Sequence, residues 1–304
     1  MSRWNTLIKI LSDKDYRILR LAKAGFYNYM DDEAYLRKLY RAHMKRDLNL
    51  ENPQLYSEKL QWLKLYDRNP LYTQLVDKYR VREYIVEKLG EEYLVPLLGV
   101  WDDPDEIDFN ALPDQFVLKC NHNSGTGMCI CRDKSKLNYE EVRKNLRRGL
   151  RENFYKKNRE WPYKEVRPCI TAEAYLEDSS DETLTDYKFF CFDGVAKIMY
   201  ISKDGGKDPR TDFFDMEFNH LAIRSKDPPA DIQPEKPALF EDMRKYAEIL
   251  SAGIPHLRVD FYFVDGKVYF GELTFYHRGG FAQITPSDWD LCLGSWISLP
   301  QKES

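Results

Sequence analysis

The sequence lacks several features that would assign a protein to a broad class. Its 304 residues contain no apolar run near the roughly 18–20 residues that a membrane span requires. Lys and Arg number 46 and Asp and Glu number 50, so the formal net charge of −4 gives no overall attraction to nucleic acid. Internal repeats and low-complexity tracts are also missing. We therefore expect a globular protein that uses neither nucleic acid nor a transmembrane segment.

Export signals and disulfide patterns are missing as well. The first residues carry a short apolar patch interrupted by charge, without the cleavage pattern of a signal peptide. We expect the six scattered cysteines to be reduced thiols of a cytoplasmic protein. Cys120, His122, Cys129 and Cys131 could form a zinc cluster, but the alternation of Cys129 and Cys131 is more typical of one strand face. With only five histidines, no Ser/His/Asp arrangement is indicated.

The hydrophobic pattern changes near residue 94. Before it, Leu, Tyr and Trp recur at three- and four-residue spacing, which predicts helices in 1–75 and a further helix at 76–90. After it, short runs rich in Val, Ile, Tyr and Phe predict strands at 94–100, 116–120, 128–131, 169–175, 187–192, 196–201, 258–264 and 267–273. Helices are expected at 138–156, which is basic, and at 237–253, and a long loop at 203–237. The chain is predicted to be α+β.

Two carboxylates mark the C-terminal pair of strands. Asp265 and Gly266 form a turn signal, and folding the chain there places residue 260 roughly opposite residue 271. Glu272 would then lie beside Asp260, close enough for both to hold one Mg²⁺, which prefers oxygen ligands and accepts the remainder from phosphate. Arg258 shares the face of Asp260 by the two-residue period and could neutralise charge on a metal-bound phosphate.

A glycine-rich loop follows the strand that carries Lys119. Gly125 and Gly127 would let backbone N–H groups approach phosphate oxygens, and the Ser124 hydroxyl could join them. The loop is neither a Walker A motif nor a Rossmann fingerprint, and it resembles instead a flap between two strands. We call residues 123–127 the flap.

Two acidic positions complete the pattern. The segment 170–176 places Glu173 near the end of a strand, where an extended backbone could read an adenine edge. Asp186 and Lys188 share the face of a later strand, and Asp186 could bind the ribose hydroxyls.

In this order the motifs resemble those of ATP-grasp enzymes, and most closely the TupA-like branch, named for teichuronopeptide biosynthesis. The matching stretches are residues 52–62, 77–79, 116–122, 186–190, 258–260 and 270–275. The resemblance implies an ATP-grasp fold that holds ATP between two α+β lobes, with a helical N-terminal extension. We accordingly expect domains at 1–75 and 76–304, the second divided into lobes at about 76–175 and 176–304.

The resemblance also implies residue roles, with ATP and Mg²⁺ as cofactors. ATP would contact Lys119, flap residues Asn123, Ser124, Gly125 and Gly127, the adenine hinge formed by Glu173, Ala174, Tyr175 and Leu176, and Asp186. The implied catalytic residues are Arg258, Lys188 and Lys203, and the implied metal ligands are Asp260, Glu272 and Thr274. The family often has Asn where Thr274 stands, which puts a second metal ion in doubt. His277 and Arg278 are candidate binders of the acceptor carboxylate.

The reaction implied by the resemblance joins a carboxylate to an amine through an acyl-phosphate. The TupA-like branch suggests a uronic-acid carboxylate, small or glycan-linked, and an amino acid or amine, in cell-surface polysaccharide biosynthesis, with other enzymes of that process as possible partners. Two alternatives remain open at this stage: a sugar or small-molecule kinase of the ATP-grasp type, and a non-catalytic nucleotide-binding partner in a polysaccharide assembly complex.

Overall fold

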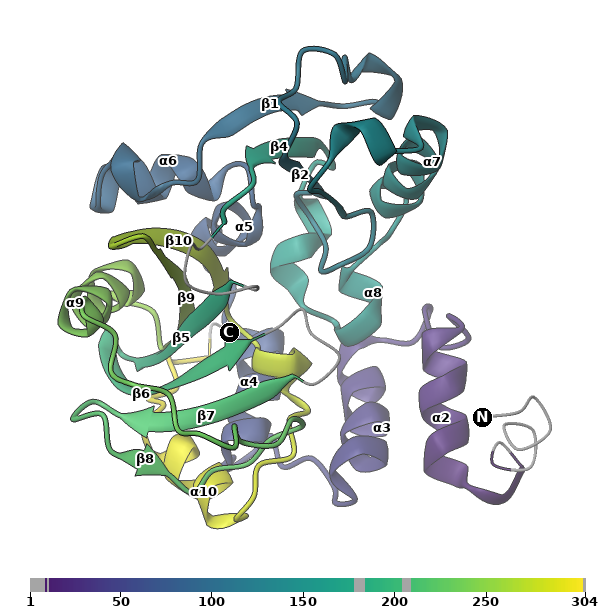
Figure 1. The fold of residues 1–304 in the computed structure, drawn as a ribbon. Coiled ribbons are helices and arrows are strands. Elements are labelled where there is room, and N and C mark those ends of the chain that lie inside the picture. Colours follow the sequence, from purple (N-terminus) through teal and green to yellow (C-terminus); the bar gives the residue numbers. More distant parts are fainter. Residues whose placement is uncertain (1–8, 10, 178–183, 204–208, 303–304) are drawn as a thin grey trace. The chain divides into compact units, whose positions relative to one another are not determined.

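The computed structural model describes residue 9 and residues 11–177, 184–203 and 209–302, which Figure 1 draws as a coloured ribbon. The chain divides into two compact units. Unit 1 comprises Met1–Arg68, Tyr155–Trp161 and Tyr276–Ser304, and unit 2 comprises Asn69–Phe154 and Pro162–Phe275. These unit boundaries differ from the domain boundaries predicted at residues 75 and 175. The predicted domain boundaries stay predictions. Among the helices of the described residues, none is both long and apolar enough to cross a membrane.

Unit 1 is helical in its described part. Its helices are α2 (Lys14–Lys23), α3 (Asp32–Met44), α4 (Tyr56–Tyr66), α8 (Tyr155–Asn158) and α10 (Asp288–Ser295), with the 3₁₀ segment η5 (His277–Gly280). Helices α4 and α10 are joined by buried Asp290, which accepts hydrogen bonds from the backbone N–H and the hydroxyl of Ser57. Arg159 is buried and donates to the carbonyls of Tyr27, Asn28 and Met30, which ties segments distant in sequence together. Helices are confirmed in residues 11–75 of the predicted helical region, and residues 1–8 and 10 lie outside the described residues.

The smaller sheet of unit 2 is antiparallel, with strand order β1-β4-β2-β3. Its strands are β1 (Leu97–Trp101), β4 (Ile170–Ala174), β2 (Phe116–Cys120) and β3 (Cys129–Cys131). Helix α7 (Tyr139–Leu150) covers one face, because Val142 and Leu146 pack against strand residues such as Phe116 and Leu118 in one apolar cluster. By the alternation of a strand, Lys119 and Glu173 point to the other face.

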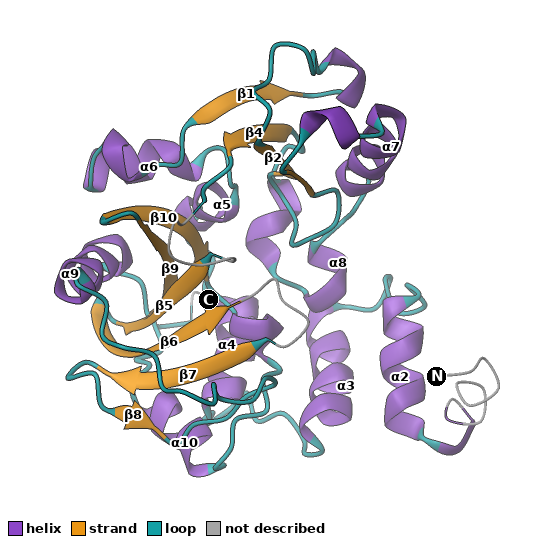
Figure 2. Cartoon of the chain, in the orientation of Figure 1, coloured by secondary structure: helices purple, strands orange, loops and turns teal. Residues whose placement is uncertain are grey.

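The larger sheet of unit 2 has the order β10-β9-β5-β6-β7-β8 and is antiparallel throughout. Its strands are β5 (Thr185–Phe192), β6 (Val195–Lys203), β7 (Arg210–Asp215), β8 (His220–Leu221), β9 (His256–Val264) and β10 (Lys267–Thr274). Helix α9 (Phe240–Ser251) lies against one side of this sheet (Figure 2), where Phe240 packs on Phe189. One face is therefore an apolar core, and the charged strand residues Asp186, Lys188, Arg258 and Asp260 lie on the other.

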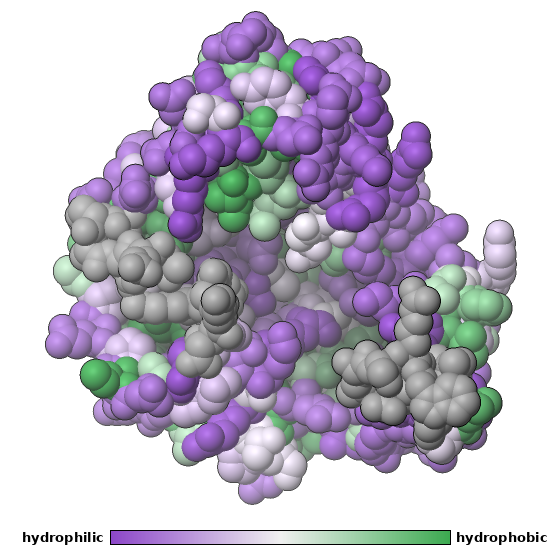
Figure 3. All heavy atoms as spheres, turned by 45° about the vertical axis from the view of Figure 1, so that its right-hand side comes forward, coloured by the Kyte–Doolittle hydropathy of each residue, from purple (hydrophilic) through white to green (hydrophobic). Residues whose placement is uncertain are grey.

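The remaining elements are short. They are α5 (Leu71–Val76), α6 (Val81–Lys88) and the 3₁₀ segments η1 (Glu91–Tyr93), η2 (Pro104–Glu106), η3 (Lys134–Lys136) and η4 (Trp161–Glu165). Hydrophilic side chains cover most of the face drawn in Figure 3, and the hydrophobic ones form separate patches.

Two predictions of secondary structure are wrong. The segment 203–237 is not a loop throughout, because β7 pairs along its whole length with β6 and β8 continues the sheet. The β7 sequence, Arg210-Thr-Asp-Phe-Phe-Asp215, lacks the alternation of a half-buried strand, so only its pairing partners make it one. Helix α7 ends at Leu150 rather than at residue 156, after Gly149 has weakened its last turn. The predicted strands are confirmed with ends shifted by a few residues.

Candidate nucleotide and metal site

The β9–β10 hairpin brings Asp260 and Glu272 directly opposite each other. From Lys267 to Phe270 the register follows the turn, but Gly271 is bulged out and the pairing resumes with Glu272 on Asp260. The expectation that residue 271 lies opposite residue 260 is therefore wrong by one position. A Cβ atom on Gly271 would lie 3.0 Å from the Asp260 carbonyl oxygen, so the bulge leaves little room for a side chain.

Arg258 holds both carboxylates. Its Nε atom donates to Asp260 Oδ1 at 2.7 Å, and its Nη2 atom donates to Asp260 Oδ2 at 2.6 Å and to Glu272 Oε1 at 3.0 Å. Asp260 is 1% exposed, whereas the Glu272 side chain is 41% exposed. The predicted position of Arg258, on the strand face of Asp260, is confirmed, and the guanidinium offsets part of the negative charge of the two carboxylates.

Lys188 joins this cluster from the adjacent strand. It is paired with Asp260 in the β5–β9 register, and its Nζ atom lies 2.9 Å from Asp260 Oδ2 and 2.9 Å from Asp186 Oδ1. Burial disfavours the charged amine, but Asp260 and Asp186 outweigh burial and raise the pKa of Lys188. Asp186 and Lys188 thus share a face, as the sequence predicted.

The side chains at the hairpin fit a magnesium ion. Thr274 donates from Oγ1 to Glu272 Oε1 at 3.2 Å, so two carboxylates and a hydroxyl, all oxygen donors, stand together. Within the described ranges, no cluster of three or more His, Cys, Asp or Glu side chains is arranged to hold a metal. Few protein oxygens, completed by water and phosphate, are the usual Mg²⁺ environment. The zinc alternative at Cys120, His122, Cys129 and Cys131 is excluded by the same result, which covers these described residues.

The electrostatics of Glu272 favour its ionised form. Burial alone would raise its pKa, but Lys78, Arg258 and Lys188, in this order of influence, lower it to about 2. The carboxylate is therefore charged at any pH at which a metal ion would bind.

Lys119 and Glu173 form an ion pair on the face of the smaller sheet that points away from α7. The Lys119 Nζ and Glu173 Oε2 atoms are 2.5 Å apart, and Arg82 Nη1 approaches Glu173 Oε1 at 3.9 Å. The pair lines a narrow cavity of about 20 Å³ together with Lys78, Tyr262 and Gly271. Because Gly271 lies on β10 and Lys119 on β2, this cavity connects the two sheets of unit 2.

The flap lies between β2 and β3, where the sequence placed it. Ser124 and Gly125 are exposed, whereas Asn123 and Gly127 are buried. Gly125 and Gly127 have φ of +80° and +75°, values that favour glycine. A Cβ atom at Gly125 would meet nothing within 4 Å, so the tip of the flap is open to a ligand from outside.

The chain matches a known protein family over most of its length. The profile of the TupA-like ATP-grasp family matches residues 58–298. The chain belongs to the TupA-like ATP-grasp family. Its two antiparallel sheets and mixed helices make it an α+β protein with the ATP-grasp fold. Among curated proteins, none matches the sequence.

Solved structures similar to this TupA-like ATP-grasp protein are distant in sequence. D-alanine–D-alanine ligase from Bacillus anthracis, solved with ATP, is 16% identical over 66% of this chain and 54% of its own, with a TM-score of 0.40. The Helicobacter pylori D-alanine–D-alanine ligase is 13% identical over 80% of this chain and 69% of its own, with a TM-score of 0.42. D-cycloserine synthetase DcsG is 17% identical over 74% and 70%, with a TM-score of 0.42. The chain thus spans about half the length of the first of these.

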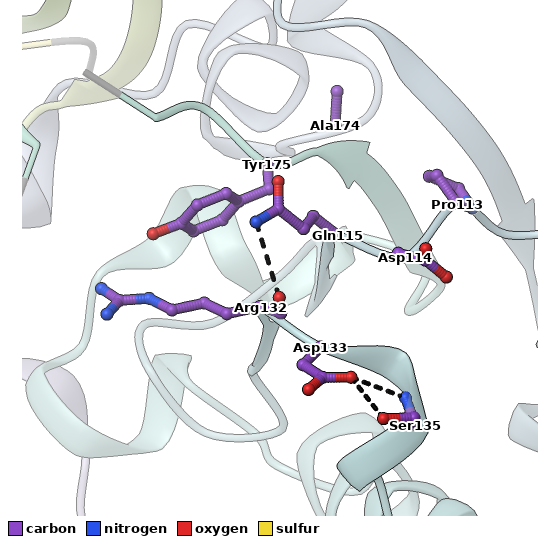
Figure 4. Close-up of a pocket in the computed structure, with 8 residues that line it drawn as sticks. All are labelled: Pro113, Asp114, Gln115, Arg132, Asp133, Ser135, Ala174 and Tyr175. Atoms are coloured by element: carbon purple, nitrogen blue, oxygen red, sulfur yellow. Dashed lines mark hydrogen bonds between the residues drawn. The ribbon is translucent and has the colours of Figure 1, made fainter. Parts of the chain in front are cut away.

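The remaining predicted residues of this TupA-like protein lie at strand ends and in loops. Strand β4 ends at Ala174, so Tyr175 and Leu176 leave the sheet. Ala174 and Tyr175 line an open pocket of about 830 Å³ in which the Arg132 guanidinium lies 5.7 Å from the Tyr175 ring (Figure 4). Lys203 is the last residue of β6 and pairs with Thr185. The structure does not describe its side chain. His277 is buried and Arg278 exposed in η5, which belongs to unit 1, so the structure does not bring them into the unit that contains Glu272.

The basic segment predicted as a helix at 138–156 lines a surface groove, and it does not contribute to the charged cluster around Asp260. Its cations Lys144, Arg147, Arg148 and Arg151 line an open surface groove with Met128 and Ile130 of the β3 edge. Arg147 is already paired with Asp105. This groove does not include any of the predicted ATP or metal residues.

The sequence reasoning missed one residue of the site, Lys78. Its Nζ atom donates to the carbonyl of flap residue Asn123 at 2.7 Å, and the charges of Glu272 and Glu173 act on it. Burial lowers the pKa of Lys78 despite these carboxylates. Residues 77–79 had contributed to the family resemblance. The signal available was a lysine directly after Asp77, whose carboxylate accepts from the backbone N–H groups of Tyr79 and Arg80 just before α6.

Proposed function

We propose that this protein is an ATP-dependent carboxylate–amine ligase that works through an acyl-phosphate. The observation that supports the proposal is the charged cluster of unit 2. There, Arg258 and Lys188 hold Asp260 and Glu272 on one sheet face, and a cavity lined by Lys78, Lys119 and Glu173 reaches the same hairpin at Gly271. Such a set of cations beside an oxygen-only metal site suits a triphosphate and has no side chain placed as a nucleophile.

ATP would lie along this cavity as the phosphoryl donor. Lys119 and Lys78 would bind phosphate oxygens, and the backbone N–H groups at Ser124 and Gly125 would cover them. Tyr175 and Leu176, where the chain leaves β4, would present backbone groups to the adenine, and Asp186 would accept the ribose hydroxyls. The cavity has room for about one water molecule, so the Lys119–Glu173 pair must separate when a nucleotide binds.

Asp260 and Glu272, with Thr274 in support, would hold Mg²⁺, which draws charge from the phosphate oxygens. Some of the N–H groups of Arg258 and Lys188 would then donate to the transferring phosphoryl group in place of the carboxylates. Lys203, at the end of β6, is proposed to reach the terminal phosphate. The carboxylate oxygen of the acceptor attacks the γ-phosphorus, the bond to the β-phosphate oxygen breaks, and ADP leaves.

The second step forms the amide. The amine nitrogen attacks the acyl carbon, loses a proton and expels inorganic phosphate. Water must be kept from the acyl-phosphate meanwhile, which is the task of the flap. From its family we propose a uronic-acid carboxylate on a small molecule or glycan as acceptor, an amino acid or amine as the second substrate, and a place in polysaccharide biosynthesis.

ADP release in the presence of hydroxylamine tests the proposal. Purified protein with MgATP is offered uronic acids, their sugar nucleotides and amino acids, one carboxylate at a time. Hydroxamate that forms in step with ADP supports the ligase and identifies the carboxylate. ADP with a phosphorylated product that hydroxylamine does not consume would replace the ligase by a kinase, and an absence of ADP with every carboxylate would refute it for this panel.

A further inference from the structure

The flap packs against one side of α7, with which it makes several contacts. Asn123 donates from Nδ2 to the Gly149 carbonyl at 3.1 Å. At Met128, the residue that directly follows the flap, the backbone carbonyl accepts a hydrogen bond from Asn145 Nδ2 at 3.0 Å. Asn145 is itself oriented by Arg148, whose Nη2 donates to its Oδ1 at 2.7 Å, which leaves the amide nitrogen for the flap side.

Between these two hydrogen bonds the backbones meet without side chains. A Cβ atom on Gly127 would lie 2.8 Å from Gly149 Cα and 2.9 Å from Cys120 Sγ. A Cβ atom on Gly149 would lie 2.7 Å from Cys120 Sγ, 2.7 Å from Gly127 Cα and 2.9 Å from the Thr126 carbonyl oxygen. Gly149 has no positive φ, so its backbone conformation does not call for glycine. Glycine is needed there because the flap backbone and the Cys120 side chain both approach closely.

The contact residues on α7 follow a helical spacing. Asn145 and Gly149 are four positions apart, which aligns them along one side of the helix. Just beyond the end of α7, the Glu152 carbonyl oxygen lies 3.0 Å from His122 Nε2. Val142 and Leu146 form the neighbouring side, which packs on the core of the smaller sheet. One helix is therefore fixed to the sheet by one side and supports the flap by the next.

We propose that Asn145 and Gly149 are positioning residues for nucleotide binding: they hold the flap in the conformation that covers the phosphates of ATP. This inference rests on the proposed function, in which the flap binds those phosphates. A flap supported in this way is already ordered before the nucleotide binds, so binding loses little conformational entropy in ordering it. Displacement of its backbone weakens the grip on phosphate and admits water to the acyl-phosphate, while the acceptor carboxylate still binds.

Two variants of α7 test the proposal, with a matched control. Gly149→Ala introduces the clashing Cβ atom, and Asn145→Ala removes one hydrogen bond without adding an atom. Lys144→Ala changes an exposed neighbour on the same helix. Each variant is compared with wild type for melting temperature, KM for ATP, kcat, and hydroxamate formed per ADP. Asn145→Ala keeps the test valid if Gly149→Ala does not fold.

We expect KM for ATP to rise about 10-fold or more in Gly149→Ala and less in Asn145→Ala, with kcat less affected, since small misplacements of a positioning group are costly. Hydroxamate per ADP should fall in both variants, and Lys144→Ala should match wild type. A purely structural role would lower melting temperature without changing hydroxamate per ADP, and that result would overturn the inference.

Lys119→Met distinguishes a failure of the α7 inference from a failure of the proposed nucleotide site. If it weakens ATP binding while folded Gly149→Ala and Asn145→Ala retain the wild-type KM and coupling, the inference is wrong and the proposed site stands. If Lys119→Met binds ATP as wild type does, the proposed nucleotide site itself is wrong, and the inference is overturned with it.

Discussion

The two carboxylates of the hairpin should respond differently to loss of their charge. Asp260 is almost fully buried and paired with two buried cations, so Asp260→Asn leaves Arg258 and Lys188 without their shared partner. Removing one member of a buried pair costs about 3–5 kcal/mol. At about 2–4 °C per kcal/mol for a domain of this size, the melting temperature should fall by about 6–20 °C.

Glu272 is 41% exposed at its side chain and receives hydrogen bonds only from Arg258 and Thr274 among the described contacts. Glu272→Gln keeps the shape of the side chain, and solvent screening limits the stability that it loses to about 0–1 kcal/mol. Its melting temperature should therefore stay within about 3 °C of wild type. Both variants lose a proposed metal ligand, so ADP formation should drop by at least about 100-fold in each.

The assay pairs calorimetric melting with ADP release, and Glu241→Gln on the exposed side of α9 is the control that should change neither. An Asp260→Asn protein as stable as wild type would refute the reasoning about the buried cluster. Glu272→Gln with near-normal turnover would refute the metal assignment. Glu272→Gln is thus the variant that isolates chemistry from folding.

Three further results are expected. Because the pKa of Glu272 is lowered from 4.5 to about 2, its stabilising contribution is complete above about pH 4.5 and is lost as the pH falls towards 2; urea unfolding should show wild type losing more stability over this interval than Glu272→Gln, and equal losses would contradict the shift. Lys119→Met should weaken ATP binding about 10-fold or more in calorimetry, since it removes a phosphate contact, whereas unchanged affinity would place the phosphates elsewhere. Gly271→Ala, whose Cβ atom would lie 3.0 Å from the Asp260 carbonyl oxygen, should shift the bulge and lower ADP release with far-UV dichroism preserved; normal turnover would show that the bulge tolerates a side chain.

The two-residue period of strands was enough to predict which charged side chains of the candidate site share a face. It placed Arg258 beside Asp260 and Asp186 beside Lys188, because residues two apart on a strand share a face whatever the rest of the fold does. The pairing of Glu272 with Asp260 needed the bulge at Gly271, and a single glycine in a strand signals a bulge without giving its direction. The sequence therefore indicated the right pair through a register that was one residue off.

Other features depend on contacts between distant segments. Lys78 reaches Asn123 across 45 positions, and Asn145 reaches Met128 across 17, so no local pattern reports either contact. Strand β7 is a strand because β6 lies beside it, and its own residues alternate too weakly to show this. The expectations drawn from family resemblance filled some of these gaps, but they assigned no role to Lys78.

The charges of unit 2 explain how such a site can exist before a nucleotide binds. Lys188 and Arg258 are buried, and burial of a cation is costly unless a carboxylate is close. Asp260, Asp186 and Glu272 meet this need at 2.6–3.0 Å, and Glu173 does the same for Lys119. A triphosphate would present oxygen atoms of the same charge and hydrogen-bonding geometry. Its binding would then exchange carboxylate partners for phosphate partners, and the carboxylates so released at the hairpin are the ones available to a metal ion. If the proposed function holds, the ion pairs would be the resting form of the proposed nucleotide and metal site. ATP should then bind more tightly in the presence of Mg²⁺, and Mg²⁺ more tightly in the presence of ATP.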